Sequence, residues 1–550
     1  MTDILRKSLN LLLRRQTNIL SAAFIIMSTV VLSQVLGLVR QRLLVSIFGA
    51  SNTVGVYLVS SKLPDFLYQL IIASLLATAF IPVFSDFLAK NKEQEAHKMA
   101  SSVITIGLLV FSGLSVILAI FAPFFLQLFN LGEGYTASQM MLMANLMRIL
   151  IVAQLLFVVA TFYTVLLQSY NHFFVPGIAA ATYNLGIIIG LFILSPFIGI
   201  YSAAVGAVIG ALIYVLIQFP VVRRLGYRYT PTFSFKTPGV MHAVHLMWPR
   251  VISNGVFYLG TISLVALISF LSDPGRKNLI FDYAQTLAFA PVALFGQTIA
   301  QAAFPVLSRE KDRLEDFRAT FMSSFNQMLF LILPISVLIL VLRIPIVRLV
   351  FGADQFDWEA TVLTGRTLAF FSISIFSQAL IALVSRGFYA LHDSKTPLIT
   401  GALSTVFLVA LSALFVLQFK WGIESIAVAF TTASIVQLVI LFLLLDRRVG
   451  RFEKLPLLFS LTKFFFATVF TGFALYIPIK ILDQLVFDTT RTVNLLTLTG
   501  ISSLAGLSLY LLLAWLFNIK EAGTYILMFK KIGNWREILG KSDEVIVEQR

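Results

Sequence analysis

The stretch Ser33-Gln34-Val35-Leu36-Gly37-Leu38-Val39-Arg40-Gln41-Arg42 decides how the rest of the chain is interpreted. It lies inside an apolar run, residues 20–48, that is long enough to cross a bilayer as a tilted helix at about 1.5 Å per residue. A charged residue near the centre of such a helix costs about 2.5–3.5 kcal/mol on insertion scales, so it usually faces a watered cavity or a bundle interior. We therefore expect Arg40 to line a polar cavity.

Two interpretations stay open for Arg40 and Arg42. The question is more open for Arg42, because it lies nearer the end of the run. Either they line the cavity, or their long side chains extend to the membrane surface. The next apolar run, residues 54–84, contains Lys62 and Asp65. Three cations and one carboxylate therefore fall within the first two predicted spans.

The composition excludes an ordinary soluble domain. The 550 residues are 58% hydrophobic and 12% charged, with a mean hydropathy of +0.91, whereas charged residues approach a quarter of a typical soluble domain. The net charge of +15 is spread over many loops and does not form one basic patch, so it favours membrane topology over nucleic-acid binding. The chain has no cysteine, which excludes disulfides and thiolate metal sites.

Fourteen apolar runs predict an all-α polytopic membrane protein with about 14 transmembrane helices. The runs are residues 20–48, 54–84, 100–126, 137–166, 176–196, 200–222, 240–271, 279–307, 319–342, 360–385, 398–418, 422–445, 457–482 and 493–517. Most Lys and Arg residues follow the even-numbered runs or lie in the two ends of the chain, and the positive-inside rule then makes both termini cytoplasmic. We expect residues 1–19 to be an uncleaved, basic, amphipathic cytoplasmic segment and residues 518–550 to be a cytoplasmic tail.

The chain also repeats itself weakly, at a period of about 223 residues. Pro82 in Phe80-Ile-Pro-Val-Phe-Ser85 corresponds to Pro305 in Phe304-Pro-Val-Leu-Ser308, 223 residues later. Three more pairs keep nearly the same offset: Phe129 with Phe351, Pro176 with Pro397, and Arg223 with Arg447.

The repeat predicts two lobes of six helices each, residues 20–226 and 240–452, followed by two extra helices in residues 457–517. Because six is even, both copies enter the membrane from the same side and form a parallel repeat. Transporters with this plan place their substrate between the halves and expose it to each side of the membrane in turn.

Three groups of residues resemble the MurJ (MviN) lipid II flippase family, within the multidrug/oligosaccharidyl-lipid/polysaccharide exporter superfamily. The first group opens the chain: Ser33-x-x-Leu36-Gly37-x-x-Arg40, Phe48-Gly49-Ala50, Lys62-Leu63-Pro64 and Ala79-Phe80-Ile81-Pro82. The second resembles the eighth span of that family: Tyr283-Ala284, Pro291, Gly296 and Phe304-Pro305-x-Leu307-Ser308-Arg309. The third precedes the eleventh run and is the most specific: Gly387-Phe388-Tyr389-Ala390-x-x-Asp393-Ser394-Lys395-Thr396-Pro397.

The resemblance implies a transporter of the inner, cytoplasmic bacterial membrane that moves a polyprenyl-diphosphate-linked peptidoglycan precursor from the inner to the outer leaflet. It covers residues of about 20 to 517 and matches Arg40 to a cavity arginine of the family. A diphosphate needs cationic partners, and the planar guanidinium of arginine suits phosphate oxygens. We expect the substrate site to consist of Arg40, Arg42, Lys62, Arg250, Ser33, Gln34, Gln41 and Gln285.

The chain departs from the family at several charged positions. Gln34 and Gln41 stand where the family usually has an arginine and an aspartate, and Gly55 replaces a further acid. Tyr68 stands where a second-span arginine is usual, and Gln285 and Ala288 replace an arginine and an acid in the eighth span. Fewer charges and more amides would therefore hold the head group, or the cargo differs.

Some other polar residues have simpler interpretations. Asp393 precedes Ser-Lys-Thr-Pro397, which is typical of a helix cap, and a role in ion binding is the alternative for it and for Asp65. His242 and His245 lack an evident third ligand, so we predict no metal site. No cofactor is expected, since no Walker-type phosphate loop occurs. Coupling to a monovalent cation or to the membrane potential would then supply the energy.

The sequence leaves the cargo and the mode of action open. The first alternative is a flippase for another polyprenyl-diphosphate-linked oligosaccharide, and the second is a membrane scaffold that binds such lipids without moving them. A cation-coupled drug exporter is disfavoured because its cavity would be expected to keep intramembrane acids. The expected partners are a lipid-linked diphosphate glycan, membrane lipids and cell-wall synthesis proteins, with no nucleic acid.

Overall fold

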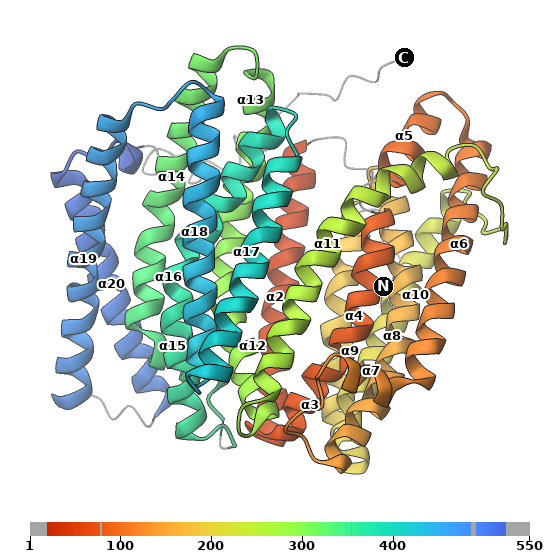
Figure 1. Cartoon of the computed structure of the whole chain (residues 1–550), viewed down its shortest axis with the longest axis horizontal. Helices are drawn as coiled ribbons and strands as arrows, with labels where there is room; N and C mark the ends of the chain where they lie inside the picture. The colour runs from red at the N-terminus through yellow and green to blue at the C-terminus, as the bar shows by residue number, and fades with distance from the viewer. Residues whose placement is uncertain (1–18, 77–79, 354, 486–490, 524–550) are drawn as a thin grey trace, which may run out of the picture. The chain divides into compact units, whose positions relative to one another are not determined.

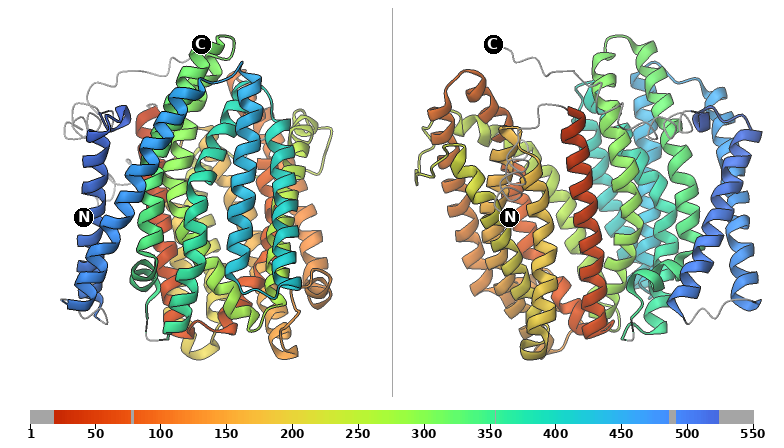
Figure 2. Two further views of the ribbon diagram at one scale, coloured as in Figure 1. Left: turned by 60° about the vertical axis from the view of Figure 1, so that its left-hand side comes forward. Right: turned by 180° about the vertical axis from the view of Figure 1, so that it is seen from behind.

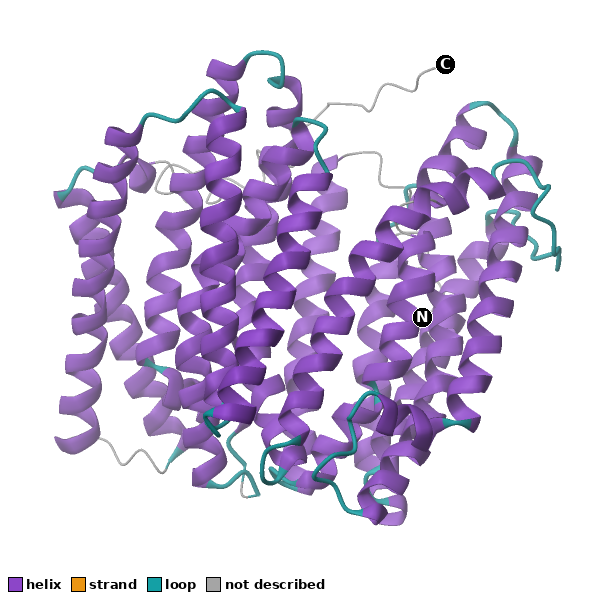
Figure 3. Ribbon diagram, viewed as in Figure 1, coloured by secondary structure: helices purple, strands orange, loops and turns teal. Residues whose placement is uncertain are grey.

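A computed structural model describes residues 19–76, 80–353, 355–485 and 491–523. All regular secondary structure in these residues is helical (Figure 3). Residues 1–18 of the predicted cytoplasmic segment and most of the predicted tail 518–550 lie outside the described residues. The chain divides after Arg276 into two compact units, here called unit 1 and unit 2.

Unit 1 contains the helices up to α11 (Figure 1). They are α2 (Ile19–Phe48), α3 (Asn52–Ser60), α4 (Lys62–Tyr68), the π-helix η1 (Gln69–Ala73), α5 (Ile81–Ala89), α6 (Glu93–Ile120), α7 (Ala122–Leu128), α8 (Ala137–Ser169), α9 (Phe174–Ile198), α10 (Tyr201–Arg224) and α11 (Val240–Ser269). Within unit 1, α9 packs closely on α10 and α2, and α11 packs on α4, η1 and α6.

Unit 2 begins at Lys277, inside α12. Its helices are α12 (Pro274–Pro291), the π-helix η3 (Val292–Gly296), α13 (Gln297–Arg309), α14 (Leu314–Val341), α15 (Arg343–Phe351), α16 (Trp358–Ala390), α17 (Lys395–Ala413), the π-helix η4 (Leu414–Gln418), α18 (Glu424–Arg448), α19 (Lys454–Leu485) and α20 (Thr492–Leu516). Figure 2 shows the long helices of unit 2 running side by side. The last pair, α19 and α20, packs on α14 and α15, and the Tyr510 hydroxyl donates to the Phe330 carbonyl at 2.8 Å.

Thirteen helices among the described residues are long and apolar enough to cross a membrane. They correspond to thirteen of the fourteen predicted spans, and the exception is the second, residues 54–84. There α3 ends at Ser60, α4 starts at Lys62, and η1 replaces the α-helical hydrogen bonds from Gln69. Pro64, in the first turn of α4, has no N–H to donate to the end of α3, and the Ser60 and Ser61 hydroxyls donate to the Tyr57 and Leu58 carbonyls.

The backbone carries the same repeat as the sequence. The π-helices η1 and η3 start at Gln69 and Val292, 223 residues apart. Both α8 and α16 have 33 residues, and each is capped by a side chain that accepts from a backbone N–H, Thr136 and Asp357 respectively. The compact units nevertheless do not follow the predicted lobe limits, since α11 groups with unit 1 whereas the predicted second lobe starts at residue 240.

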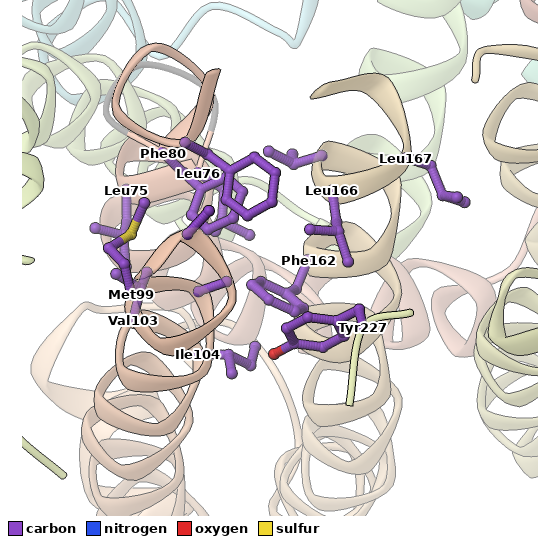
Figure 4. Packing of buried hydrophobic residues seen from close by; sticks show 14 of the residues in the cluster. Leu75, Leu76, Phe80, Met99, Val103, Ile104, Phe162, Leu166, Leu167 and Tyr227 are labelled. Carbon is purple, nitrogen blue, oxygen red and sulfur yellow. The ribbon is translucent and has the colours of Figure 1, made fainter. Parts of the chain in front are cut away.

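The segment after α10 is fixed to α6 by hydroxyl pairs. Ser101 contacts Tyr227 at 3.1 Å, Ser102 contacts Thr237 at 3.0 Å and Thr105 contacts Tyr229 at 2.9 Å. Beside them lies a core of buried side chains from α6, α8 and the end of the second predicted span, shown in Figure 4. This core holds the segment between α10 and α11 in place and so positions α11.

Candidate functional site

The Ser33–Arg42 stretch is helical throughout and packs on α9. The amide nitrogen of Asn184 in α9 donates to the Ser33 carbonyl at 3.0 Å and lies 3.4 Å from its hydroxyl. A Cβ built on Gly37 would lie 3.8 Å from the same amide nitrogen, an ordinary van der Waals contact, so Gly37 lies on the side of α2 that faces α9. Ser33, Gly37 and Arg40 recur at helical spacing and share this side of α2.

Arg40 and Asp65 lie in one neighbourhood. Both charges interact electrostatically with the phenols of Tyr57 in α3 and Tyr183 in α9. Both charged side chains are half-buried, so part of the surface of each stays exposed. A cation from α2 and a carboxylate from α4 therefore both lie within electrostatic range of the same two phenols.

Asp65 is also joined to α8 and to α11. The amide nitrogen of Gln154 in α8 donates to Asp65 Oδ1, and the phenol of Tyr258 in α11 interacts electrostatically with this carboxylate. One turn beyond Asp65, the Tyr68 hydroxyl is hydrogen-bonded to the Thr161 hydroxyl of α8. Amides and phenols from several helices thus surround the carboxylate.

The other predicted residues of α2 and α4 face different directions. Gln41 is buried, whereas Gln34 and Arg42 of the same stretch are exposed. Lys62, on the same helix as Asp65, is half-buried. Because successive helical residues turn by about 100°, the stretch cannot place all of its polar side chains in one cavity. Arg40, Lys62 and Asp65 are partly buried in unit 1, as is Arg148 of α8.

Arg250 lies on α11 and its side chain is exposed. One turn later, the Asn254 amide donates to Ser74 Oγ at 3.0 Å and to the Gln69 carbonyl of η1 at 3.4 Å. Tyr258, one further turn along, reaches the Asp65 neighbourhood. Arg250 therefore lies on the same side of α11 as Tyr258 but two turns away from it.

The two remaining predicted residues belong to unit 2. Gln285 is half-buried in α12. Asp393 accepts from the backbone N–H groups of Lys395 and Thr396, at 3.1 and 3.0 Å, and from the Thr396 hydroxyl at 2.8 Å. Burial acts to raise the pKa of Asp393, but these hydrogen bonds and the nearby Arg448 outweigh it and hold that pKa below its ordinary value. The carboxylate thus caps the start of α17.

Gly55, in α3, is enclosed by the first turn of α12. A Cβ on Gly55 would overlap the Gly275 carbonyl oxygen. Asn52, at the start of α3, fixes this turn by accepting from the Arg276 N–H at 2.9 Å and donating to Asp273 at 3.3 Å. A side chain at position 55 has no room in this arrangement.

Sequence reasoning missed the uncharged partners of this site: Asn184, Gln154, Thr161, Tyr57, Tyr183 and Tyr258. One signal was available for two of them, since Gln154 and Thr161 are spaced by seven residues in the apolar run 137–166. The tyrosines give no comparable signal because single tyrosines are common in spans. In the described residues no group of three or more His, Cys, Asp or Glu is arranged to hold a metal ion, and His242 and His245 are exposed.

The arrangement suits binding better than covalent chemistry. Guanidinium and ammonium groups can hold phosphate oxygens, whereas phenols and amides can hold hydroxyl groups or further oxygens. The carboxylate of Asp65 balances part of the positive charge. An anionic head group with polar substituents is the class of ligand that fits these groups.

Comparison with known proteins gives consistent matches. A sequence model of the family described as "Lipid II flippase MurJ" matches residues 44–494. The probable lipid II flippase MurJ of Thermotoga maritima is 29% identical over 413 residues, which cover 75% of this chain and 82% of that protein. The protein of the same description from Buchnera aphidicola of Schizaphis graminum is 24% identical over 507 residues, covering 89% and 96%.

Solved structures share the fold. A structure of lipid II flippase MurJ in an inward closed conformation matches with a TM-score of 0.74 and 22% identity, covering 90% of this chain and 98% of that one. An inward-facing multidrug resistance MATE transporter of the MOP superfamily matches with a TM-score of 0.63 and 14% identity, covering 76% and 94%. With most of its length matched by the family's sequence model, this chain, a multi-pass membrane transporter and not an enzyme, belongs to the MurJ lipid II flippase family.

Proposed function

We propose that this protein moves lipid II, the lipid-linked peptidoglycan precursor, from the inner to the outer leaflet of the cytoplasmic membrane by alternating access. The observation that carries the proposal is the partly buried Arg40 in a membrane-spanning helix, at the position that matches a cavity arginine of the family. Lys62 and Arg42 supply further positive charge on neighbouring segments. Such cations are expensive in a membrane unless they serve an anionic ligand such as a diphosphate.

The electrical potential across the membrane can supply part of the driving force. One elementary charge moved through 100 mV is worth about 2.3 kcal/mol. A site with two cations, Arg40 and Lys62, and one carboxylate carries excess positive charge, which the potential can move when the cargo has left. Coupling to a monovalent cation is the alternative source.

The proposal is tested by complementation. The native lipid II flippase of a bacterium is depleted, this protein is expressed, and labelled lipid II exposed on the outer leaflet is measured. We expect rescue by the unaltered protein, loss of rescue with Arg40→Ala, and full rescue with Arg224→Ala, since Arg224 is exposed in the last turn of α10. Flipping by the Arg40→Ala protein at the unaltered rate, with equal membrane expression, would remove Arg40 from the transport site.

A second cargo is favoured by the changed charge set. Gln41 and Tyr68 stand where the family has charges, and the tyrosine hydroxyl is hydrogen-bonded to Thr161 within unit 1. Fewer charges would suit another polyprenyl-diphosphate-linked oligosaccharide with a less acidic head group. If membrane-inserted protein fails to rescue, the same cells are scored for export of other lipid-linked glycans, and a scaffold that moves no lipid would fail in both measurements.

A further inference from the structure

The carboxylate of Asp65 stands among the groups proposed to bind the cargo. It is half-buried in α4 and fixed by the Gln154 amide of α8, which donates to Oδ1. Lys62 precedes it by three residues, a spacing that puts both side chains on the same side of a helix. The acid is therefore held in place beside at least one of the cations.

Arg40 supplies a second cation nearby, since its helix α2 packs on α3 and α9, and α3 packs on α4 and α8. Its charge and that of Asp65 act on the same two phenols, Tyr57 and Tyr183. Gln41, the neighbour of Arg40, carries no charge, although the family usually has an aspartate there. In this chain the acid that accompanies the arginine comes from α4.

We propose that Asp65 is an internal competitor of the cargo diphosphate. A carboxylate and a diphosphate both accept hydrogen bonds from cationic donors, so they compete for Arg40 and Lys62. In the empty protein the carboxylate neutralises part of the cationic site. When the diphosphate enters, repulsion by Asp65 weakens its binding and so speeds its release, since transport requires binding that is weak enough to reverse.

This inference rests on the proposed function only in taking a diphosphate as the anionic group of the cargo. It makes Asp65 a specificity-determining residue that sets affinity, and it assigns Gln154 a positioning role. Asp65→Asn is the informative change because asparagine keeps the oxygen that accepts from Gln154 and loses only the charge.

The test measures binding of fluorescent undecaprenyl diphosphate to the purified full-length protein in detergent. We expect Asp65→Asn to bind on the order of tenfold more tightly than the unaltered protein, as removal of one charge from a partly buried site implies. Asp86→Asn is the matched control, because Asp86 forms an exposed ion pair with Lys90 at 2.7 Å in the same unit. Its affinity should not change.

A double variant distinguishes competition from a general effect of the substitution. If Asp65 acts through the arginine, the gain from Asp65→Asn shrinks in an Arg40→Gln background. A gain of the same size in that background, or no gain in the single variant, overturns the proposal. In cells, Asp65→Asn should lower the rate of lipid II flipping although binding is tighter.

Inorganic pyrophosphate separates this inference from the identity of the cargo. Protection against thermal unfolding by pyrophosphate is measured for the same proteins. If the polyprenyl lipid fails to bind but pyrophosphate protects Asp65→Asn more than the unaltered protein, the competition is supported and a polyprenyl-diphosphate-linked cargo is wrong. If neither compound distinguishes the two proteins, Asp65 is not a competitor of diphosphate.

Discussion

Uncharged polar residues hold the charged residues of unit 1 at defined positions. Asn184 and Gln154 each cross from one helix to another, to the Ser33 carbonyl and to Asp65. Hydrogen bonds between membrane helices contribute about 0.6–2 kcal/mol each. Their main effect here is therefore to fix the orientation of α2 and α4, so that Arg40 and Asp65 face the same phenols.

The Asp393 cap gives a prediction for a single residue. Asp393→Ala removes the acceptor for two backbone N–H groups at the start of α17 and should lower stability by about 0.5–2 kcal/mol. Asp393→Asn keeps an acceptor oxygen and should cost less. Thermal unfolding of the purified protein in detergent, followed by tryptophan fluorescence, measures both effects.

The same residue predicts a dependence on pH. Because the pKa of Asp393 is lower in the folded protein, its ionised form stabilises the fold above the ordinary aspartate pKa of about 3.9. This contribution is lost as the pH falls through the lower, folded-state pKa. The difference between the unaltered protein and Asp393→Ala should thus be full at pH 7 and decrease in strong acid. A difference that grows with acidification would contradict the capping role.

The second predicted span is the element in which local irregularity and candidate function coincide. Asp65 and Lys62 lie on α4, between the break at Ser61 and the π-helix η1. Asn254 of α11 is hydrogen-bonded to the Gln69 carbonyl and the Ser74 hydroxyl, which satisfies groups beside the irregular turn. Through these hydrogen bonds the irregular segment connects the charged residues of α4 to α11. π-helical turns often mark functional sites.

A close contact between two turns predicts a large effect of a small substitution. Gly55→Ala would place a methyl group in overlap with the Gly275 carbonyl, and relieving such overlap typically costs about 1–3 kcal/mol. Gly113→Ala in α6 is the matched control, because a Cβ there meets nothing within 4 Å. Thermal unfolding should show a lower midpoint for Gly55→Ala only. Equal midpoints would mean that the first turn of α12 can move away from α3.

The sequence predicted the long helices because an apolar run of 18 or more residues has few alternatives to crossing a membrane. Arg40, Lys62 and Asp65 were singled out for the same reason, since charges in such runs need an explanation, and their role in a site stays a prediction. It did not predict the break in the second span, because the π-helix depends on packing and not on composition. The contacts of Gln154 and Asn184 also could not be predicted, as a polar side chain in a span does not reveal its partner.

At the scale of the whole molecule, the internal repeat relates the two halves of the chain. The offset of about 223 residues links Pro82 to Pro305 in the sequence, and in the structure it links the start of η1 to that of η3. The two π-helices η1 and η3 are separated by the same spacing as the sequence repeat, which is seldom a coincidence. The repeat thus includes backbone geometry as well as residue types.

The absence of cysteine from the sequence allows the predicted topology to be tested directly, since every introduced cysteine would be the only thiol. A parallel repeat of six spans requires residues one repeat apart to lie on the same side of the membrane. Lys90 and Arg313, both exposed and 223 residues apart, should face the cytoplasm, whereas the exposed Glu133 and Gln355, 222 residues apart, should face outward.

A membrane-impermeant maleimide applied to intact spheroplasts should therefore label Glu133→Cys and Gln355→Cys, but label Lys90→Cys and Arg313→Cys only after lysis. The physical reason is the excess of Lys and Arg in the loops around Lys90 and Arg313, which are retained on the cytoplasmic side during insertion. Labelling of one member of a pair without the other would make the repeat inverted and would refute the parallel arrangement. Labelling of the Lys90 and Arg313 pair alone would keep the parallel repeat but reverse the orientation, placing both termini outside.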